Sequence, residues 1–345
     1  MTANNSAAAA AEYAVPDLRA SLGLAGADPA LLDTVVDGLG RVETLLREVV
    51  HSDVSVVHDA ALHLVNAGGK RFRPLFTLLA AQFNDGNTDD VIVSAAVVEL
   101  VHLATLYHDD VMDEATMRRG EASVNARWDN SVAILTGDFL FAHASRLCAD
   151  LGTDAARMIA ETFGQLVTGQ MRETVGPSDG EDRVDHYLTV IAQKTGSLIA
   201  TAGRYGGMFS GAPRGQIDAL YAYGEIIGTA FQISDDIIDI ASPADESGKT
   251  PGTDLREGVK TLPMLYALAE NADARLSQLL SGPITDDDEV HEALHLLRSS
   301  PGLDRAMATL GEYAERARAA VSDLPTCAAR DALESLADYV VARSR

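Results

Sequence analysis

Two aspartate-rich pentads set in apolar sequence constrain the fold of this chain more than any other feature. They are Asp109-Asp110-Val111-Met112-Asp113 and Asp235-Asp236-Ile237-Ile238-Asp239. In a helix, the first and last aspartates of each pentad share one face, about 6 Å apart along the axis. Like charges at this spacing oppose helix formation. Because the chain carries this arrangement twice, we expect the pentads to hold a hard divalent cation, above all Mg²⁺.

The similarity between the two pentads extends into the flanking sequence. The second pentad begins 126 residues after the first, and with this offset Ala104 matches Ala230 and Ala115 matches Ala241. Two helices with matching acidic ends predict a bundle of pseudo-twofold character, with carboxylates facing each other across a central cavity. The alternative is a pair of solvated acidic faces. It is disfavoured because apolar residues separate the aspartates, whereas solvated faces usually mix Lys with Glu.

Apolar residues recur at helical spacing along most of the chain, and alternating strand patterns are scarce. We therefore predict an all-α protein: a single large helical bundle with a central cavity over residues 29–345, after a disordered arm at 1–28. The charged, Gly-rich segment 242–258 is expected to be a mobile active-site lid. Helices are expected at Leu31–His51, Arg73–Phe83, Asp89–Met112, Asn130–Ala149, Ala155–Gly169, Arg183–Phe209, Gln216–Ile240 and Thr261–Leu280, with three more after Asp286.

Charge and cysteine content exclude several classes of function. The net charge of −24 would repel a phosphate backbone, so no nucleic-acid partner is expected. Cys148 and Cys327 are too few for a disulfide framework, which favours a reducing compartment. We see no secretory signal and no uninterrupted run of eighteen apolar residues, and so expect a cytoplasmic protein without a transmembrane helix. An oily substrate or product could still bring it to a membrane surface.

Cations gather beside the acidic pentads. The segment Gly68-Gly69-Lys70-Arg71-Phe72-Arg73-Pro74 joins a flexible turn to the start of a helix, whose N-terminal amides also favour anions. Arg118-Arg119-Gly120 follows the first pentad, and Lys249 and Lys260 follow the second. Mg²⁺ bound by carboxylates keeps coordination positions open for phosphate oxygens. Arginine presents a bidentate fork to the same oxygens, so the sequence predicts a phosphate-bearing substrate.

Taken together, these motifs resemble the trans-isoprenyl diphosphate synthases, the polyprenyl synthase family of farnesyl, geranylgeranyl and longer-chain enzymes. The resemblance runs from about Leu31 to the C-terminus. It implies a prenyltransferase of isoprenoid biosynthesis that condenses isopentenyl diphosphate head to tail with an allylic diphosphate. It rests on five motifs in order: Gly-Gly-Lys-Arg-Phe-Arg-Pro, His-Asp-Asp-Val-Met-Asp-Glu-Ala with Arg-Arg-Gly behind it, Lys194-Thr195-Gly196, Phe231-Gln232-Ile233-Ser234-Asp235-Asp236 and Gly248-Lys249.

The family resemblance also implies a role for each matching residue. Asp109 and Asp113 would bridge metal ions to the allylic diphosphate with support from Asp110, and Asp235 would hold a further ion with Asp236 and Asp239 close by. Three Mg²⁺ ions per active site and a homodimer are implied. The same diphosphate would be bound by Arg118, Lys194 and Lys249. Isopentenyl diphosphate would be bound without metal by Lys70, Arg73, His102 and Arg119, with Arg71 and Lys260 also among the substrate-binding residues. Thr195 and Gln232 would line the developing allylic cation.

Several of these residues also have an ordinary structural interpretation. A lone histidine on an apolar helix, such as His102, is often a hydrogen-bonded core residue, and Thr195 could be a helix threonine bonded to its own backbone. Lys260 could be a surface lysine, because Val259 separates it from the glycine that the family places directly before this lysine. The C-terminal Arg343-Ser344-Arg345 resembles a basic tail that some members fold over the isopentenyl site, and a frayed terminus is the alternative.

Small residues before the first pentad bear on product length. Thr105 and Ala104 lie four and five positions before Asp109, where short-chain family members place a bulky aromatic side chain. We therefore expect a hexaprenyl to decaprenyl product of the kind used for quinone side chains. A geranylgeranyl or farnesyl diphosphate synthase is the alternative. A terpene cyclase is disfavoured by the second aspartate pentad, and a non-catalytic subunit of a heteromeric synthase by the retention of every pentad aspartate.

Overall fold

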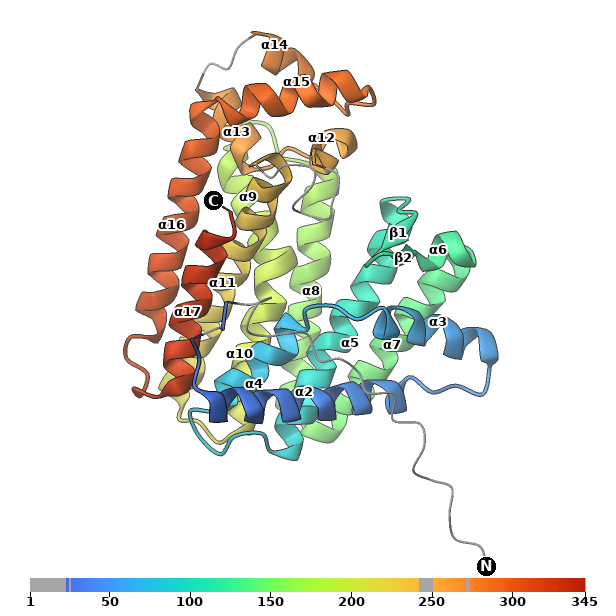
Figure 1. Ribbon diagram of the computed structural model, residues 1–345. Coiled ribbons are helices and arrows are strands. Elements are labelled where there is room, and N and C mark those ends of the chain that lie inside the picture. The colour runs from blue at the N-terminus through green and yellow to red at the C-terminus, as the bar shows by residue number, and fades with distance from the viewer. Residues whose placement is uncertain (1–22, 25, 242–250, 271–273, 345) are drawn as a thin grey trace, which may run out of the picture.

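The computed structural model describes residues 23–24, 26–241, 251–270 and 274–344, and nearly all of its regular elements are helices (Figure 1). The prediction of an all-α protein is confirmed. In chain order the elements are α2 (Pro29–Val49), α3 (Ser55–Asn66), α4 (Phe72–Ala81), α5 (Asp89–Met112), β1 (Met117–Arg118), β2 (Glu121–Ala122), α6 (Val124–Arg127), α7 (Asn130–Leu151), α8 (Thr153–Val175), α9 (Arg183–Ile191), the π-helix η1 (Ala192–Gly196), α10 (Ser197–Phe209), α11 (Arg214–Ala241), α12 (Thr253–Glu257), α13 (Leu262–Ala269), α14 (Ala274–Leu279), α15 (Asp287–Arg298), α16 (Pro301–Val321) and α17 (Ala328–Ala342).

The two helices that carry the pentads, α5 and α11, are both packed against α10. Helix α5 also packs along α7, and α11 packs along α16. Glycine permits the close approach of α10 to α11. A Cβ added at Gly224 would lie 2.7 Å from the Ala200 Cα, and one at Gly228 would lie 2.9 Å from the Gly196 Cα. Larger residues at these two positions would push apart the helices that frame the site.

The segment predicted as one helix from Arg183 to Phe209 is helical throughout, but residues 192–196 form the π-helix η1, which the sequence did not predict. A π-turn contains one more residue per hydrogen-bonded ring than an α-turn, and such turns are common at functional sites. Here the turn contains Lys194 and Thr195. The change of helix type therefore falls on two of the residues for which a chemical role is expected.

Other boundaries also differ from the sequence-based expectation. Helix α8 continues to Val175, beyond the expected end at Gly169, and α3 and the β1–β2 hairpin were not predicted. The segment expected as one helix from Thr261 to Leu280 contains two helices, α13 and α14. Figure 1 shows α12, α13, α14 and α15 gathered at one end of the bundle.

Two sequence-based predictions fall largely outside the described residues. Most of the expected N-terminal arm, 1–28, is not described, but Leu24 is fully buried and the Asp28 carboxylate caps α2 by accepting from the Leu31 N–H at 3.0 Å. Of the expected lid, residues 242–250 are not described, and the remainder includes α12.

Helices α5 and α7 are long and apolar enough to cross a membrane by length and composition alone. Neither was expected to meet this criterion. Core helices of soluble proteins also meet it, and α5 is mostly buried inside the bundle.

Candidate active site

Residues from both pentads line one cavity of about 780 Å³. Asp113, at the end of α5, and Asp236, in α11, contribute carboxylates to its wall. Arg118, Lys194 and Lys260 contribute cations from three different segments. A cavity of this size with acidic and basic walls can accommodate a charged ligand together with its counterions.

In the first pentad, Asp110 and Asp109 have different environments. Asp110 is fully buried, and its Oδ1 accepts a hydrogen bond from the Arg118 Nε at 2.6 Å. Burial raises the pKa of Asp110, with Arg118 opposing the change. The second oxygen, Oδ2, is buried with no hydrogen-bond partner among the described residues. Asp110 thus fixes Arg118 at the cavity wall and retains an unused acceptor.

Asp109 is a partly buried carboxyl whose ionisation is disfavoured in the metal-free protein. Its pKa is raised to about 6, first by burial and then by the charges of Asp113 and Glu173, with Lys194 and Arg118 acting in the opposite direction. Lys194 itself donates to the Glu173 Oε2 at 2.5 Å. A bound cation beside Asp109 would remove the cost of this negative charge.

Hydrogen bonds join Asp236 of the second pentad to the π-turn. The Tyr187 hydroxyl donates to Asp236 Oδ2, and the Gln232 Nε2 donates to Oδ1 at 3.0 Å. The Thr195 hydroxyl donates to Gln232 Oε1 at 3.1 Å. Burial raises the pKa of Asp236 to about 7, although both hydrogen bonds it accepts act in the opposite direction. Near neutral pH this carboxyl is therefore poised between its two charge states.

The remaining aspartates of the second pentad accept protein donors. Asp235 Oδ1 lies 2.5 Å from the Arg343 Nη2, and the Asp239 carboxylate accepts from the backbone N–H groups of Thr253 and Asp254 at 3.1 and 3.2 Å. The Arg343 guanidinium also stacks 3.8 Å from the centre of the Phe231 ring. The C-terminal tail is thus folded onto the second pentad.

The residues expected to bind isopentenyl diphosphate form a basic group in which Arg73, His102 and Arg119 are half-buried and Lys70 is exposed. Burial lowers the pKa of Arg73 to about 10, and its Nε has no hydrogen-bond partner among the described residues. The pKa of His102 is held well below its usual range, first by burial and then by the charges of Arg73 and Arg119. The Lys70 Nζ lies 5.5 Å from the centre of the Phe231 ring. An anion placed here would relieve the mutual repulsion of these groups.

Arg71 does not belong to this basic surface, which corrects the expectation that it binds substrate. Its side chain is 2% exposed and contacts two buried carboxylates, Glu43 and, at 2.8 Å, Glu99. Its Nη2 also donates to the Val65 carbonyl at 2.8 Å. Arg71 therefore holds the turn in place from inside the protein.

Three further expected residues are placed as follows. Lys249 lies outside the described residues. Ala104 is 1% exposed, the Thr105 hydroxyl donates to the His102 carbonyl at 2.8 Å, and neither residue lines the cavity. The expected role of Ala104 and Thr105 in product length thus concerns a region beside the cavity, on the N-terminal side of the first pentad.

Sequence reasoning missed Tyr187, Glu173 and Glu257, all of which line the cavity. Glu173 lay beyond the expected end of the helix at Gly169, whereas α8 continues to Val175. Burial raises the pKa of Glu257, and the charges of Asp113 and Asp239 add to this effect. Of these three residues, only Glu173 had a signal in the sequence, because the helical pattern of apolar residues could have been continued through it.

Described residues do not form a ready-made metal site, because no group of three or more Asp, Glu, His or Cys side chains converges among them. The donor set nevertheless fits a hard cation, since it consists of carboxylate oxygens, one of which is buried without a partner. Mg²⁺ in proteins is commonly held by one or two carboxylates, with water and substrate phosphate oxygens completing its shell. The arrangement suits ions that arrive with a phosphate-bearing ligand.

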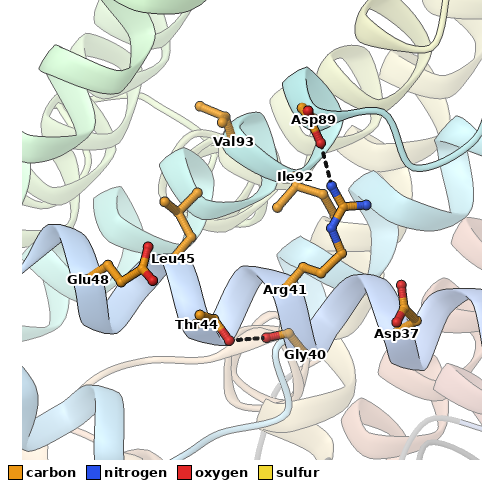
Figure 2. Close-up of a pocket in the computed structure, with 9 residues that line it drawn as sticks. All are labelled: Asp37, Gly40, Arg41, Thr44, Leu45, Glu48, Asp89, Ile92 and Val93. Atoms are coloured by element: carbon orange, nitrogen blue, oxygen red, sulfur yellow. Dashed lines mark hydrogen bonds and ion pairs between the residues drawn. The ribbon is translucent and has the colours of Figure 1, made fainter. Parts of the chain in front are cut away.

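A second hollow, of about 500 Å³, lies on the outside of the bundle between α2 and α5 (Figure 2). Two of its polar side chains, those of Arg41 and Thr44, already have partners within the hollow. Arg41 forms an ion pair with Asp89 at 2.6 Å, and the Thr44 hydroxyl donates to the Gly40 carbonyl at 3.0 Å. No pentad aspartate lines it, so the chemistry expected from the pentads belongs to the first cavity.

An all-helical bundle whose cavity is lined by residues of two aspartate-rich pentads and by several cations is an architecture suited to a phosphate-bearing ligand. Comparison with known proteins identifies the family. Residues 54–297 match the polyprenyl synthetase family model. The chain therefore belongs to the polyprenyl synthetase family, and it is an enzyme, a prenyltransferase of isoprenoid biosynthesis.

Individual relatives resemble the chain over nearly its whole length. It is 57% identical to the nonaprenyl diphosphate synthase of Mycobacterium tuberculosis, covering 92% of this chain and 95% of that protein. It is 46% identical to a dimethylallyltranstransferase of the same organism, covering 91% and 96%. A crystal structure of geranylgeranyl pyrophosphate synthase from Corynebacterium glutamicum, complexed with calcium and isoprenyl diphosphate, is 50% identical and superposes with a TM-score of 0.82, covering 92% and 98%. The relatives are consistent with the predicted medium- to long-chain trans-prenyl transfer.

Proposed function

We propose that the cavity performs the head-to-tail condensation of isopentenyl diphosphate with an allylic diphosphate. The allylic carbon–oxygen bond breaks, a carbon–carbon bond forms to the isopentenyl unit, and the proton lost from that unit leaves with the departing pyrophosphate. No side chain is assigned as a general base. The observation that carries this proposal is that Asp113 and Asp236, from separate helices, line one cavity together with Arg118 and Lys194.

The acidic wall is assigned to the allylic diphosphate. Asp109 and Asp113 on α5 would hold Mg²⁺ from one side, and Asp235, Asp236 and Asp239 on α11 from the other, with three ions in total as the family resemblance implies. Bound Mg²⁺ supplies positive charge that neutralises the leaving pyrophosphate. Arg118 and Lys194 add fixed positive charge where negative charge grows during bond cleavage.

The basic group is assigned to isopentenyl diphosphate. Lys70, Arg73, His102 and Arg119 would bind its two phosphates without metal. Burial of Arg73 with an unpartnered Nε supports this assignment, since a buried guanidinium N–H without an acceptor is costly until an anion is bound. Both diphosphates would thus be bound by positive charge, one through metal cations that carboxylates hold and one directly by basic side chains.

The polar residues of the π-turn are assigned to the carbocation. Thr195 and Gln232 are already hydrogen-bonded to each other at 3.1 Å, and both line the cavity. Their oxygens would stabilise positive charge on the allylic carbons without reacting with it. This network also connects the cation region to Asp236, so the position of the second pentad and that of the carbocation depend on each other.

The product is proposed to be a hexaprenyl to decaprenyl diphosphate. Ala104 and Thr105 leave no bulky side chain one turn below Asp109, and the 57% identity to a nonaprenyl diphosphate synthase supports a long product. A growing chain would extend along α5 toward its N-terminus, past Val101 and Val98, which are fully buried. We also propose a cytoplasmic enzyme that contacts a membrane surface only to release this product.

The proposed homodimer would form on the outer face of α7 and α8. These helices are joined by Gly152 alone, and they expose large apolar side chains that a monomer would leave in water. Leu135 is 66% exposed, Met171 59% and Val175 77%. Sedimentation of the Leu135→Asp variant should show monomers where the wild-type protein forms dimers.

Incubation of the purified protein with labelled isopentenyl diphosphate, Mg²⁺ and each allylic starter tests the reaction. Products would be dephosphorylated and their lengths measured by mass spectrometry. Consumption of isopentenyl diphosphate with formation of long prenyl alcohols is expected. Absence of turnover with every starter would favour a non-catalytic subunit and refute the proposal, while a single short product would refute only the chain length.

A further inference from the structure

A single buried carboxylate on α5, Glu99, contacts the arginines behind the proposed isopentenyl site. Glu99 is 1% exposed, and its Oε1 accepts from the Arg71 Nη1 at 2.8 Å. The same oxygen lies 3.8 Å from the Arg119 Nη2. Glu99 also acts electrostatically on Arg73, whose pKa it raises against the lowering effects of burial and Arg119. One negative charge therefore faces three guanidinium groups.

The two arginines next to Glu99 bind the same carbonyl. Arg71 donates from Nη1 to the Gly68 carbonyl at 3.2 Å, and Arg119 donates to that carbonyl from its own Nη1. This carbonyl belongs to the turn that carries Lys70. Gly68 and Gly69 have φ values of 82° and 134°, and Arg71, which follows the turn, has a φ of 48°. Few side chains tolerate this backbone conformation, so external contacts are needed to hold the turn.

The charges gathered around this turn favour the binding of an anion. Arg73 is buried with an Nε that has no hydrogen-bond partner among the described residues, and the pKa of the neighbouring His102 is held far below its usual range. A Cβ at Gly69 would lie 2.9 Å from the Arg119 Cζ, so the glycine lets the turn lie directly on that guanidinium. The protein has thus gathered positive charge that its own acceptors do not fully satisfy.

We propose that Glu99 is the positioning residue of the isopentenyl diphosphate site: it orients Arg71 and Arg119, which hold the Lys70 turn through the Gly68 carbonyl. This inference rests on the proposed function, because it names the residue that organises one of its two diphosphate sites. Glu99 does not touch the substrate and takes no part in bond cleavage. Its effect reaches isopentenyl diphosphate through the arginines and the turn.

The Glu99→Gln variant tests this role, because glutamine keeps the size of the side chain and removes its charge. We expect the KM for isopentenyl diphosphate to rise by about tenfold or more, which corresponds to about 1.4 kcal/mol. The KM for the allylic diphosphate should stay within about twofold of the wild-type value, since the contacts of Glu99 lie away from the pentads. The kcat at saturating isopentenyl diphosphate should change less than its KM.

A pH profile separates this positioning role from a general loss of stability. In the wild-type protein the charges that act on Arg73 come from Glu99 on α5 and from Arg119 after the first pentad, while His102 nearby on α5 is held neutral. Without the Glu99 charge the pKa of Arg73 falls below about 10, so affinity for isopentenyl diphosphate should decline at lower pH than in the wild-type protein. A purely structural defect would lower affinity equally across this range.

Glu43→Gln is the matched control. Glu43 also pairs with Arg71, from α2, and is similarly buried, but the structure shows no effect of Glu43 on the pKa of Arg73. Both variants remove one negative charge from beside Arg71, so thermal melting should show comparable losses of stability. The decline of isopentenyl diphosphate affinity at high pH, the alkaline limb of the pH profile, should move to lower pH in Glu99→Gln and not in Glu43→Gln.

Calorimetric titration of isopentenyl diphosphate in EDTA gives a readout independent of turnover. The inference alone would be overturned if the wild-type protein catalyses the reaction and the Glu99→Gln variant binds isopentenyl diphosphate with the same affinity and the same pH dependence as the wild-type protein. Wild-type protein that does not bind isopentenyl diphosphate would instead refute the proposed function. If Glu99→Gln does not fold, Glu99→Asp, which keeps the charge and shortens the reach, must raise the KM for isopentenyl diphosphate and leave the alkaline limb in place. An unchanged KM in that variant would also overturn the inference.

Discussion

Replacing Tyr187 with phenylalanine should shift the pH at which the second pentad binds metal. Tyr187 is 9% exposed, and its hydroxyl donates to the Asp236 carboxylate. A hydrogen bond to a charged group contributes about 1.5 to 3 kcal/mol. Since 1.36 kcal/mol corresponds to one pKa unit, its loss should raise the pKa of Asp236 from about 7 by about one to two units. Asp236 is 5% exposed, so water can replace little of this interaction.

The direction of the effect follows from which form binds metal. Mg²⁺ or Mn²⁺ binds the ionised carboxylate, so affinity falls as the pH drops through the pKa of Asp236. In Tyr187→Phe this decline should begin one to two pH units higher. In the metal-free protein, Asp236 has a pKa raised above its unfolded value, so the folded state binds the extra proton and loses stability as the pH rises from about 4 to 7. The variant should extend that loss to higher pH.

Titration of Mn²⁺ followed by electron paramagnetic resonance, repeated across the pH range, measures this shift directly. Tyr223→Phe is the control, since it removes the same hydroxyl from a fully buried tyrosine that donates to the Leu333 carbonyl at 2.7 Å instead of to a pentad aspartate. The control should leave the metal-binding profile where it is in the wild-type protein. An unchanged profile in Tyr187→Phe, or an equal shift in both variants, would refute this account of Asp236.

Three further substitutions should have distinct effects. Asp109→Asn should lower turnover by at least about a hundredfold while circular dichroism stays unchanged, and near-normal turnover would contradict its assignment. Ala104→Phe should shorten the product, measured by mass spectrometry, at a stability cost of about 1–3 kcal/mol because the site is buried; an unaltered product length would place the growing chain elsewhere. Arg343→Gln removes a positive charge 2.5 Å from Asp235, so Mn²⁺ affinity should rise by about tenfold, and weaker binding would contradict this competition.

The acidic half of the site could be predicted from sequence because it depends on local spacing. Aspartates four positions apart share a helix face whatever the rest of the fold does. The same spacing predicts that Asp113 and Asp109 lie on one side of α5. Tyr187 escaped notice because its hydrogen bond reaches Asp236 across 49 residues. No local pattern reports a contact of that kind.

Arg71 shows why neighbouring cations cannot be sorted by residue type. In the sequence it is one of three cations in a single turn, and all three were assigned to substrate. Its partners Glu43 and Glu99 each lie 28 residues away, in opposite directions along the chain. The left-handed φ at Arg71 turns its side chain toward them. The π-turn between α9 and α10 could not be predicted either, because no glycine or proline precedes Lys194 within that turn to indicate a change of helix type.

The two halves of the site share one electrostatic property despite their opposite charges. Burial raises the pKa of Asp109 to about 6 and that of Asp236 to about 7, and it lowers that of Arg73 to about 10. In each case the protein holds an ionisable group in surroundings that disfavour its charge. Such groups reduce the stability of the empty protein, and ligands of opposite charge restore it. Under the proposed function, the binding of each diphosphate would therefore draw on free energy stored in the fold, because Mg²⁺ would relieve the carboxylates and the second diphosphate would relieve the arginines.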